Sequence, residues 1–137
     1  MSAEFETQKA LYTALNGDAP LMALANAVYD FAPQVADGGD GGAFPYVEVG
    51  AIVFGEMDTK TRTGFDFVAR IHTRSRSSSS KETKDIQGAI YNVLHLQDVV
   101  VANYDTILLR RETSDVTKVA DGSFHGVCEY RGLIDKT

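Results

Sequence analysis

Cysteine is nearly absent from this sequence. Cys128 is the single cysteine among 137 residues, which excludes an internal disulfide. Its setting, GVCEYRG, is typical of a strand and indicates a small packed side chain rather than a reactive thiol. The fold must therefore rest on a hydrophobic core, which a chain of this length can bury without disulfides or metals.

Long apolar runs are also missing. No run approaches the roughly 18 residues of a membrane span. The N-terminal MSAEFETQKALY carries charges where a signal peptide has its apolar segment. We therefore expect no membrane partner. Hydrophobic residues make up 44% and charged residues 23% of the chain, as in an ordinary globular protein, and we expect residues 1–137 to form a single domain.

Basic residues are in the minority. Lysine and arginine total 13 against 19 aspartates and glutamates, which gives a net charge of −6. A protein that grips a nucleic-acid backbone usually has a basic surplus or a basic stripe. The balance therefore disfavours a DNA-binding protein, but it allows a protein past which DNA slides.

Residue types that carry chemistry are scattered. His72, His95 and His125 have no second histidine or cysteine at the spacing of metal ligands, and no serine lies in a G-x-S-x-G turn. We therefore expect no catalytic, cofactor or metal site, and no enzyme. Acids on the expected strands are predicted to be solvated or paired with arginines. The acids are Asp66, Asp105, Glu112, Asp115 and Glu129, and the arginines are Arg70, Arg110, Arg111 and Arg131.

The first third of the chain predicts two helices and a short strand. Residues 2–15 have helical periodicity, with Gly17 as a natural stop. The predicted buried stripe consists of Phe5, Leu11, Tyr12 and Leu15, and the residues outside it are Glu4, Glu6 and Lys9. A second, short helix begins after Asp18, which can cap it, and AVYDF is a short strand candidate.

A glycine-rich segment, APQVADGGDGGAFP, follows. Its glycines and prolines exclude a regular element and predict a mobile loop. Such a loop can cradle a phosphate, but here no helix or lysine follows, and Asp37 and Asp40 flank the glycines. We therefore interpret it as a loop that contacts a neighbouring protein or, alternatively, whose acidic tip lines a channel for DNA.

Two strands come next. FPYVEVGAIVF, residues 44–54, is rich in aromatic and β-branched residues, GEMDTKTRTG is a polar connection, and FDFVARIHT alternates clearly. In that last strand Phe65, Phe67, Ala69 and Ile71 face one way and Asp66, Val68, Arg70 and His72 face the other. The pattern predicts a sheet that helices cover on one side.

The stretch RSRSSSSKET leads into a further helix. Ser79 and Glu82 have the spacing of a capping box, and the helix is expected from Ser79 to about Leu96. Its apolar stripe is Ile86, Ala89, Ile90, Val93 and Leu94. Arg74 and Arg76 beside the serines favour a solvated joint or a subunit contact, and a nucleic-acid site is the weaker alternative because no aromatic platform accompanies them.

Two closing strands, residues 106–116 and 124–134, are predicted to form a hairpin through Asp121 and Gly122. The fold class is therefore α+β, a mainly antiparallel sheet with two longer helices packed on one face. The other sheet face mixes apolar residues, arginine and tyrosine, as subunit interfaces do. Its expected members are Val68, Arg70, His72, Leu108, Arg110, Tyr130 and Arg131.

Several stretches together resemble the tail-completion, or tail-terminator, family of long-tailed phages and gene transfer agents. They cover nearly the whole chain, and their weight comes from their order rather than from any single motif. They are ETQKALYTALNGDAPLMALAN with VYDFAPQ, FPYVEVG, TRTGFDFVARIHTRSRSSSSKETKDIQGAIYNVLH and ILLRRETSDVTKVADGSFHGVCEYRGLI.

The resemblance implies a structural virion protein without catalytic residues or cofactors. Such a protein would form a ring, typically of six subunits, at the head-proximal end of the tail tube. It would end tube polymerisation, with the tail tube protein and the head connector or stopper protein as partners, and DNA would pass through the channel without specific binding. Another neck component, such as a head-completion or connector protein, is the main alternative, and a small cytoplasmic enzyme or ligand-binding domain is a more distant one. The expected interface residues are Asp37, Asp40, Arg70, His72, Arg74 and Arg76.

Overall fold

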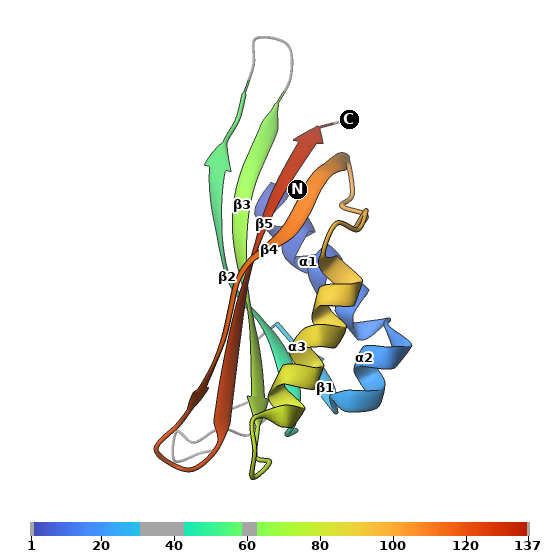
Figure 1. Ribbon diagram of the computed structural model, residues 1–137. Helices are drawn as coiled ribbons and strands as arrows, with labels where there is room; N and C mark the ends of the chain where they lie inside the picture. Colours follow the sequence, from blue (N-terminus) through green and yellow to red (C-terminus); the bar gives the residue numbers. More distant parts are fainter. Residues whose placement is uncertain (1, 31–42, 59–62, 137) are drawn as a thin grey trace.

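The computed structural model describes residues 2–30, 43–58 and 63–136. Residues 31–42, which include the glycines and the acids Asp37 and Asp40 of the glycine-rich segment, lie outside the described residues, so the roles expected of this loop stay predictions. Within the described part, helices and strands follow one another in the order that the sequence predicts (Figure 1).

Five strands form one sheet in the order β1-β2-β3-β5-β4. They are β1 (Ala27–Tyr29), β2 (Tyr46–Glu56), β3 (Gly64–Ser75), β4 (Tyr104–Lys118) and β5 (Phe124–Lys136). The short β1 runs parallel to β2, and every other neighbouring pair is antiparallel. The mainly antiparallel sheet is therefore confirmed.

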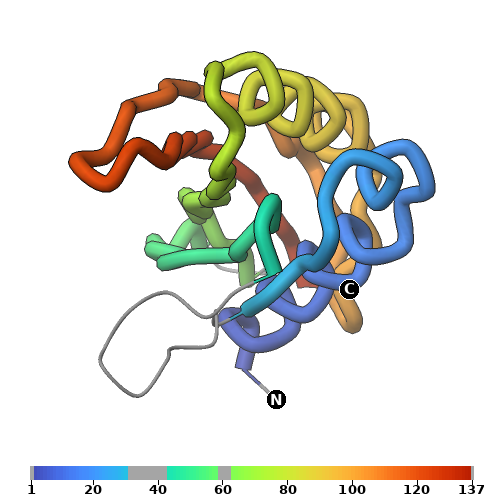
Figure 2. Tube along the Cα trace, turned by 90° about the horizontal axis from the view of Figure 1, so that it is seen from below, coloured from blue at the N-terminus to red at the C-terminus, as the bar shows by residue number. Residues whose placement is uncertain are grey.

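The helices α1 (Ala3–Asn16), α2 (Ala19–Leu24) and α3 (Lys81–Leu94) all pack on one face of this sheet (Figures 1 and 2). The two longer ones, α1 and α3, each have 14 residues. This arrangement confirms the predicted α+β class, and none of the helices that the structure describes covers the opposite sheet face. No helix among residues 2–30, 43–58 and 63–136 combines the length and apolarity that a membrane crossing requires.

Helix α1 begins after Ser2, whose side chain accepts a hydrogen bond from the Phe5 N–H, and it ends at Gly17 as predicted. Its predicted buried stripe is partly wrong. Phe5 is 55% exposed, whereas Glu6 is buried. The buried face follows Ala3, Glu6, Thr7, Ala10, Leu11 and Leu15. Small and polar residues let α1 approach the sheet closely, and a search for large apolar side chains overlooks such a face.

The short helix α2 is confirmed with its cap. Asp18 Oδ2 accepts a hydrogen bond from the Leu21 N–H at 3.0 Å, and Pro20 lies in the first turn. This bond satisfies a donor that a helix N-terminus otherwise leaves unpaired. Leu21, which follows, is fully buried and ties the helix to the core.

The predicted capping box of α3 is wrong. Ser80 precedes the helix and makes no side-chain cap bond. Glu82 Oε1 instead accepts a hydrogen bond of 2.5 Å from the hydroxyl of Ser75, a buried residue at the end of β3. A carboxylate that the spacing assigns to the helix start thus joins the helix to the sheet.

The apolar stripe of α3 is confirmed. Ile86, Ile90 and Leu94 have no exposed surface, Ala89 is buried, and Val93 is partly buried against the same core. The sequence did not predict that Thr83 and Gln87 extend this face. Gln87 Nε2 donates to the Asp115 carbonyl oxygen of β4 at 2.9 Å, so a polar side chain fixes the helix on the sheet.

Strand boundaries differ from the sequence expectation at β2. The strand begins at Tyr46 and continues through Gly55 and Glu56, which were expected to belong to a polar connection. They are strand residues because they pair with Asp66 and Phe65 of β3. Pairing across the sheet therefore overrides the weak strand propensity of these two residues.

The closing hairpin is confirmed, and β4 extends two residues beyond the expected strand at each end. Gly122 at its turn has φ 91°, a conformation that glycine adopts without strain, and the Val119 N–H donates to the Ser123 carbonyl oxygen. Cys128 on β5 is fully buried, and burial raises the pKa of its thiol. The expectation of a small packed cysteine is therefore confirmed.

Candidate subunit interface

The uncovered sheet face, here called the open face, carries alternate residues of β3. Asp66, Val68, Arg70, His72 and Arg74 lie on it, between inward-facing neighbours that are largely buried. In the sheet register their direct partners on β5 are Leu133, Arg131, Glu129, Val127 and His125. The alternation predicted for this strand is confirmed, and it displays Arg70, His72 and Arg74 together.

A belt of ion pairs crosses the middle of the open face. Arg70 Nε lies 3.5 Å from Glu129 Oε2, and Arg131 pairs with Asp66. Arg110 contacts Glu112 at 3.2 Å. The predicted pairing of strand acids with arginines is therefore confirmed for these three acids. Because the pairs are substantially exposed, each adds little to the stability of the subunit, and their main effect is to fix the charge pattern of the surface.

Exposed apolar side chains occur on both outer strands of this part of the sheet. Val53 on β2 is 69% exposed and Ile107 on β4 is 63% exposed. Ile107 lines a groove of about 180 Å³ together with Met57, Phe65 and Leu133. Exposed apolar side chains on a sheet face favour contact with another protein. The sequence analysis did not single out Val53, Ile107 or Met57 for a site.

A histidine pair occupies one end of the open face. His72 Nδ1 and His125 Nε2 are 2.9 Å apart, and the two rings are within 15° of parallel with centroids 5.1 Å apart. The centroid separation is close to the N···N distance plus the two ring radii. The rings therefore lie edge to edge, with an N–H···N hydrogen bond nearly in their common plane.

This pair is not evident from the sequence, because 53 positions separate its members. Pairing of Thr73 with Gly126 in the register places His72 and His125 diagonally across the two strands. The histidines were treated as isolated, although both stood on expected strands. The two histidines could have been recognised as neighbours only if the register between β3 and β5 had been known.

A missing side chain on β2 makes room for His72. A Cβ atom at Gly50 would lie 2.5 Å from His72 Nε2, so only glycine allows the imidazole to pack there. The pKa values of His72 and His125 are both lowered, mainly because burial disfavours the charged rings. The pair is consequently biased toward its uncharged form near neutral pH.

The two remaining arginines mark the edge of the histidine end. Arg74 belongs to β3 and, like Arg70, lowers the pKa of His72. Arg76 lies just beyond the strand, and its guanidinium carbon is 3.9 Å from the centroid of the Phe44 ring, a cation–π contact. Arg76 therefore holds the segment before β2 against the joint that follows β3.

One residue assigned to this face by sequence is misplaced. Tyr130 pairs with Ala69, which points toward the helices, and its side chain is fully buried. Burial raises the pKa of its hydroxyl. The β-bulges in β4, between Thr106 and Leu108 and between Arg111 and Thr113, change the alternation that a sequence reading assumes.

The serine joint is a chain of turns. Ser75, Ser77 and Ser79 each accept, through the hydroxyl oxygen, a hydrogen bond from the backbone N–H two residues further on, at 3.1, 3.5 and 3.4 Å. The predicted turn role is confirmed, because this is the local bonding that serine offers in bends. These hydroxyls serve the backbone, so the segment is built as a joint.

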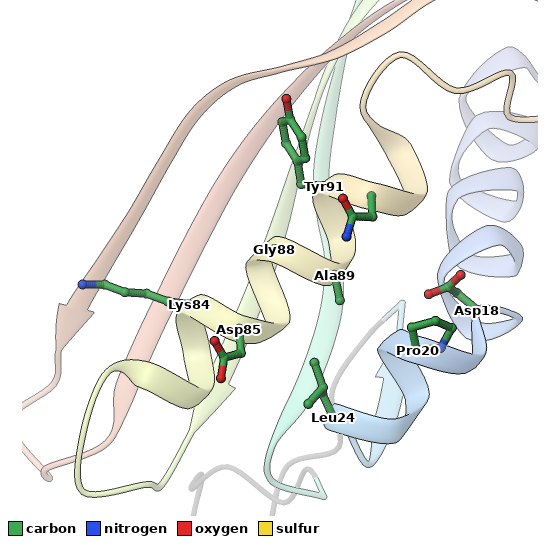
Figure 3. Close-up of a pocket in the computed structure, with 9 residues that line it drawn as sticks. Asp18, Pro20, Leu24, Lys84, Asp85, Gly88, Ala89 and Tyr91 are labelled. Carbon is green, nitrogen blue, oxygen red and sulfur yellow. The ribbon is translucent and has the colours of Figure 1, made fainter.

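A hollow of about 660 Å³ lies in the helical layer, between α2 and α3 (Figure 3). Leu24 points into it toward Ala89, whereas Lys84 points away from α2. Within the described ranges, no group of three or more histidine, cysteine or acidic side chains could hold a metal ion. The hollow thus brings together no recognisable catalytic set among the described residues.

Comparisons with known proteins show the family and the fold of this chain. Residues 9–135 match the family model of the tail completion protein gp17. A solved chain from the virion of a native gene transfer agent particle has a similar fold, with TM-score 0.79, 23% sequence identity and 93% of each chain covered. A comparison with curated proteins gave no match. Because the family match spans nearly the whole chain, the protein belongs to the tail completion protein gp17 family.

Proposed function

We propose that this chain, a structural protein of the virion tail by its family, forms a ring at the head-proximal end of the tail tube. The ring ends tube polymerisation and joins the tail to the head connector. The observation that carries the proposal is the open face, which combines exposed Val53 and Ile107 with a belt of fixed charges in a tail completion protein. Such a surface suits repeated contact between subunits.

A closed ring needs two different surfaces on each subunit, because each copy meets its two neighbours through unlike patches. The open face and the helical layer are two such surfaces on opposite sides of the sheet (Figure 2). The outer edge of β4 is partly occupied: Arg111 N–H donates to His95 Nδ1 and Leu96 N–H donates to the Leu109 carbonyl oxygen. Covered edge groups disfavour simple edge-to-edge joining there, which supports contact through the faces.

The charge balance fits a ring through which DNA passes. With a net charge of −6, the subunit presents an overall field that repels phosphates. DNA would move through the channel without specific binding, because a bound phosphate backbone requires a basic surface that releases counterions. The tail tube protein and the head connector or stopper protein are the proposed partners. The same proposal includes a ring of six subunits, a protein without catalytic activity, and contacts that Asp37 and Asp40 make with a neighbouring protein.

Two measurements test this function. Light scattering and negative-stain electron microscopy of the purified protein should show a closed ring. Particles assembled without the protein should carry tails of irregular, extended length that lack heads. Tails of normal length that merely remain unjoined would indicate the alternative, another neck component that completes the head or connector. Normal infectious particles without the protein would refute both.

A further inference from the structure

Only one hydrogen atom can lie between the facing ring nitrogens of His72 and His125, where it forms an N–H···N hydrogen bond. Their facing nitrogens are 2.9 Å apart in nearly coplanar rings, so one nitrogen must donate and the other must accept. This holds when both rings are neutral and when one of them is cationic. When both rings are protonated, two N–H groups face each other and the hydrogen bond is lost.

The position of the pair determines which ring must move. His72 Nε2 faces Gly50 so closely that a Cβ atom would not fit between them. His72 is therefore backed by β2, while its other nitrogen meets His125. Both rings stand on the open face, but only His72 is held in this way, so repulsion within a doubly charged pair displaces His125.

Four charged residues act on the pair from the strands around it. Glu48 of β2 and Asp115 of β4 favour protonation, whereas Arg70 and Arg74 of β3 disfavour it. These are the charged groups that face the rings among the described residues. Two acids are opposed by two arginines, so the surroundings do not supply a net negative charge that would stabilise a second proton.

We propose that His72 and His125 form a proton-sensitive latch that keeps the open face ready for a neighbouring copy near neutral pH and disrupts that contact when a second proton enters. This inference rests on the proposed function, because it takes the open face as a surface where subunits meet. The lowered pKa values are consistent with a neutral, latched pair under cytoplasmic conditions. Acidification would release the contact at every junction of a ring, since each subunit carries the same pair.

The first test follows the pair in the single subunit by NMR titration of the histidine side chains from about pH 8 to about pH 5. We expect the two rings to titrate in two linked steps, with the second proton entering below the first. In His72→Gln the remaining His125 should titrate in one step. Independent titration of both rings near the ordinary histidine value, unchanged by that substitution, would overturn the latch.

The second test measures self-association by light scattering near pH 7.5 and near pH 5.5. Wild-type affinity should fall by up to about tenfold, the limiting factor for a pKa that is one unit lower in the docked than in the free subunit. The double variant His72→Gln/His125→Gln should associate at both pH values with little change. His95→Gln, which removes a histidine outside the pair, is the matched control and should keep the wild-type response.

The outcomes separate this inference from the proposed function. Equal wild-type association at both pH values would overturn the latch while leaving the ring intact. A pH response that survives in the double variant would also overturn it, because other groups would then be responsible. Failure to associate at either pH would refute the ring and, with it, any role of the latch in assembly.

Discussion

Arg70 and Glu129 stand directly opposite each other on β3 and β5, with 3.5 Å between Nε and Oε2. The Thr113 hydroxyl of β4 donates to Glu129 Oε1 at 3.1 Å and extends the contact to a third strand. The Arg70 side chain is nevertheless 58% exposed. An ion pair so open to water contributes at most about 1 kcal/mol to the stability of the subunit. Its larger effect should be on what the open face can bind.

Reversing the charge of Arg70 should therefore weaken association more than folding. In Arg70→Glu two carboxylates would face each other across the strands, a modest penalty at an exposed site. Thermal melting of the dilute subunit should shift by only a few degrees. Light scattering should show a weaker ring, because the wrong charge recurs at every junction.

Lys136→Glu makes the same charge change at the exposed end of β5 and serves as the control. It should leave association close to wild type. Arg76→Glu should also weaken the ring. This substitution reverses a charge beside the open face and, in addition, removes the contact between Arg76 and Phe44. Equal losses in all three variants would mean that net charge, rather than the open face, governs assembly.

Ile90→Ala should destabilise the subunit by about 2–5 kcal/mol, because the side chain has no exposed surface and its loss leaves a cavity between α3 and the sheet. Urea unfolding followed by circular dichroism measures the change. Lys81→Ala, in the exposed first turn of the same helix, should change the free energy of unfolding far less, because its side chain is open to solvent. A loss below about 0.5 kcal/mol for Ile90→Ala would contradict the packing.

Acid should destabilise the folded subunit through the histidine pair. Burial lowers the pKa values of His72 and His125 in the folded state below the ordinary value of 6.5. As the pH falls through that value, the unfolded chain takes up protons that the folded chain resists, so the free energy of unfolding decreases. The stabilising contribution of the neutral pair is therefore present above the ordinary histidine pKa of 6.5 and is lost as the pH falls below it, through the lowered pKa values of the folded state.

Melting temperatures of the dilute subunit between about pH 7.5 and about pH 5.5 check this sign. The fall should be smaller in His72→Gln/His125→Gln, which does not titrate in that range. His95→Gln should fall as steeply as wild type. A wild-type melting temperature that rises on acidification would show that Glu48 and Asp115 outweigh burial, which would invert the expected linkage.

The sequence sufficed to predict those elements whose periodicity reports burial directly. The alternation from Phe65 to His72 and the stripe from Ile86 to Leu94 each point one set of side chains toward the core, and both were confirmed. Of the two helix caps predicted from the sequence, one was confirmed and one was wrong. Asp18 caps α2 as expected, whereas Glu82 accepts a hydrogen bond from Ser75 on β3. A rule based on residue spacing considers only hydrogen-bond partners that are near in the sequence. It does not include a partner such as Ser75 that the folded sheet brings close to Glu82.

Features of the open face depend on register, which a single sequence leaves undetermined. The histidine pair joins residues on two strands that are distant in the chain, and Tyr130 faces the helices because it pairs with Ala69. Shifting a register by one residue moves every side chain to the other face. The sequence therefore predicted that arginines and acids lie on these strands, but it did not predict which arginine pairs with which acid.

Two glycines give a final, opposed pair of predictions. A Cβ atom at Gly126 on β5 would lie 2.4 Å from Gln87 Nε2 and 2.7 Å from Thr83 Cγ2, so α3 approaches the sheet over a bare backbone. Gly126→Ala should therefore cost about 1–3 kcal/mol, the usual penalty of overpacking. Gly88 lies inside α3, where a Cβ would meet nothing within 4 Å. Gly88→Ala should stabilise the subunit by about 0.5–1 kcal/mol, because alanine has the higher helix propensity.

Urea unfolding of both variants beside wild type measures the two signs in one experiment. Because each variant adds the same methyl group, differences in composition cancel and only the surroundings of the site remain. Gly126→Ala should also loosen the Gln87 contact with β4, which amide hydrogen exchange in α3 would detect as faster exchange near that residue. Stabilisation by Gly126→Ala would mean that Gln87 and Thr83 yield without strain, and the close approach of α3 would then not depend on glycine.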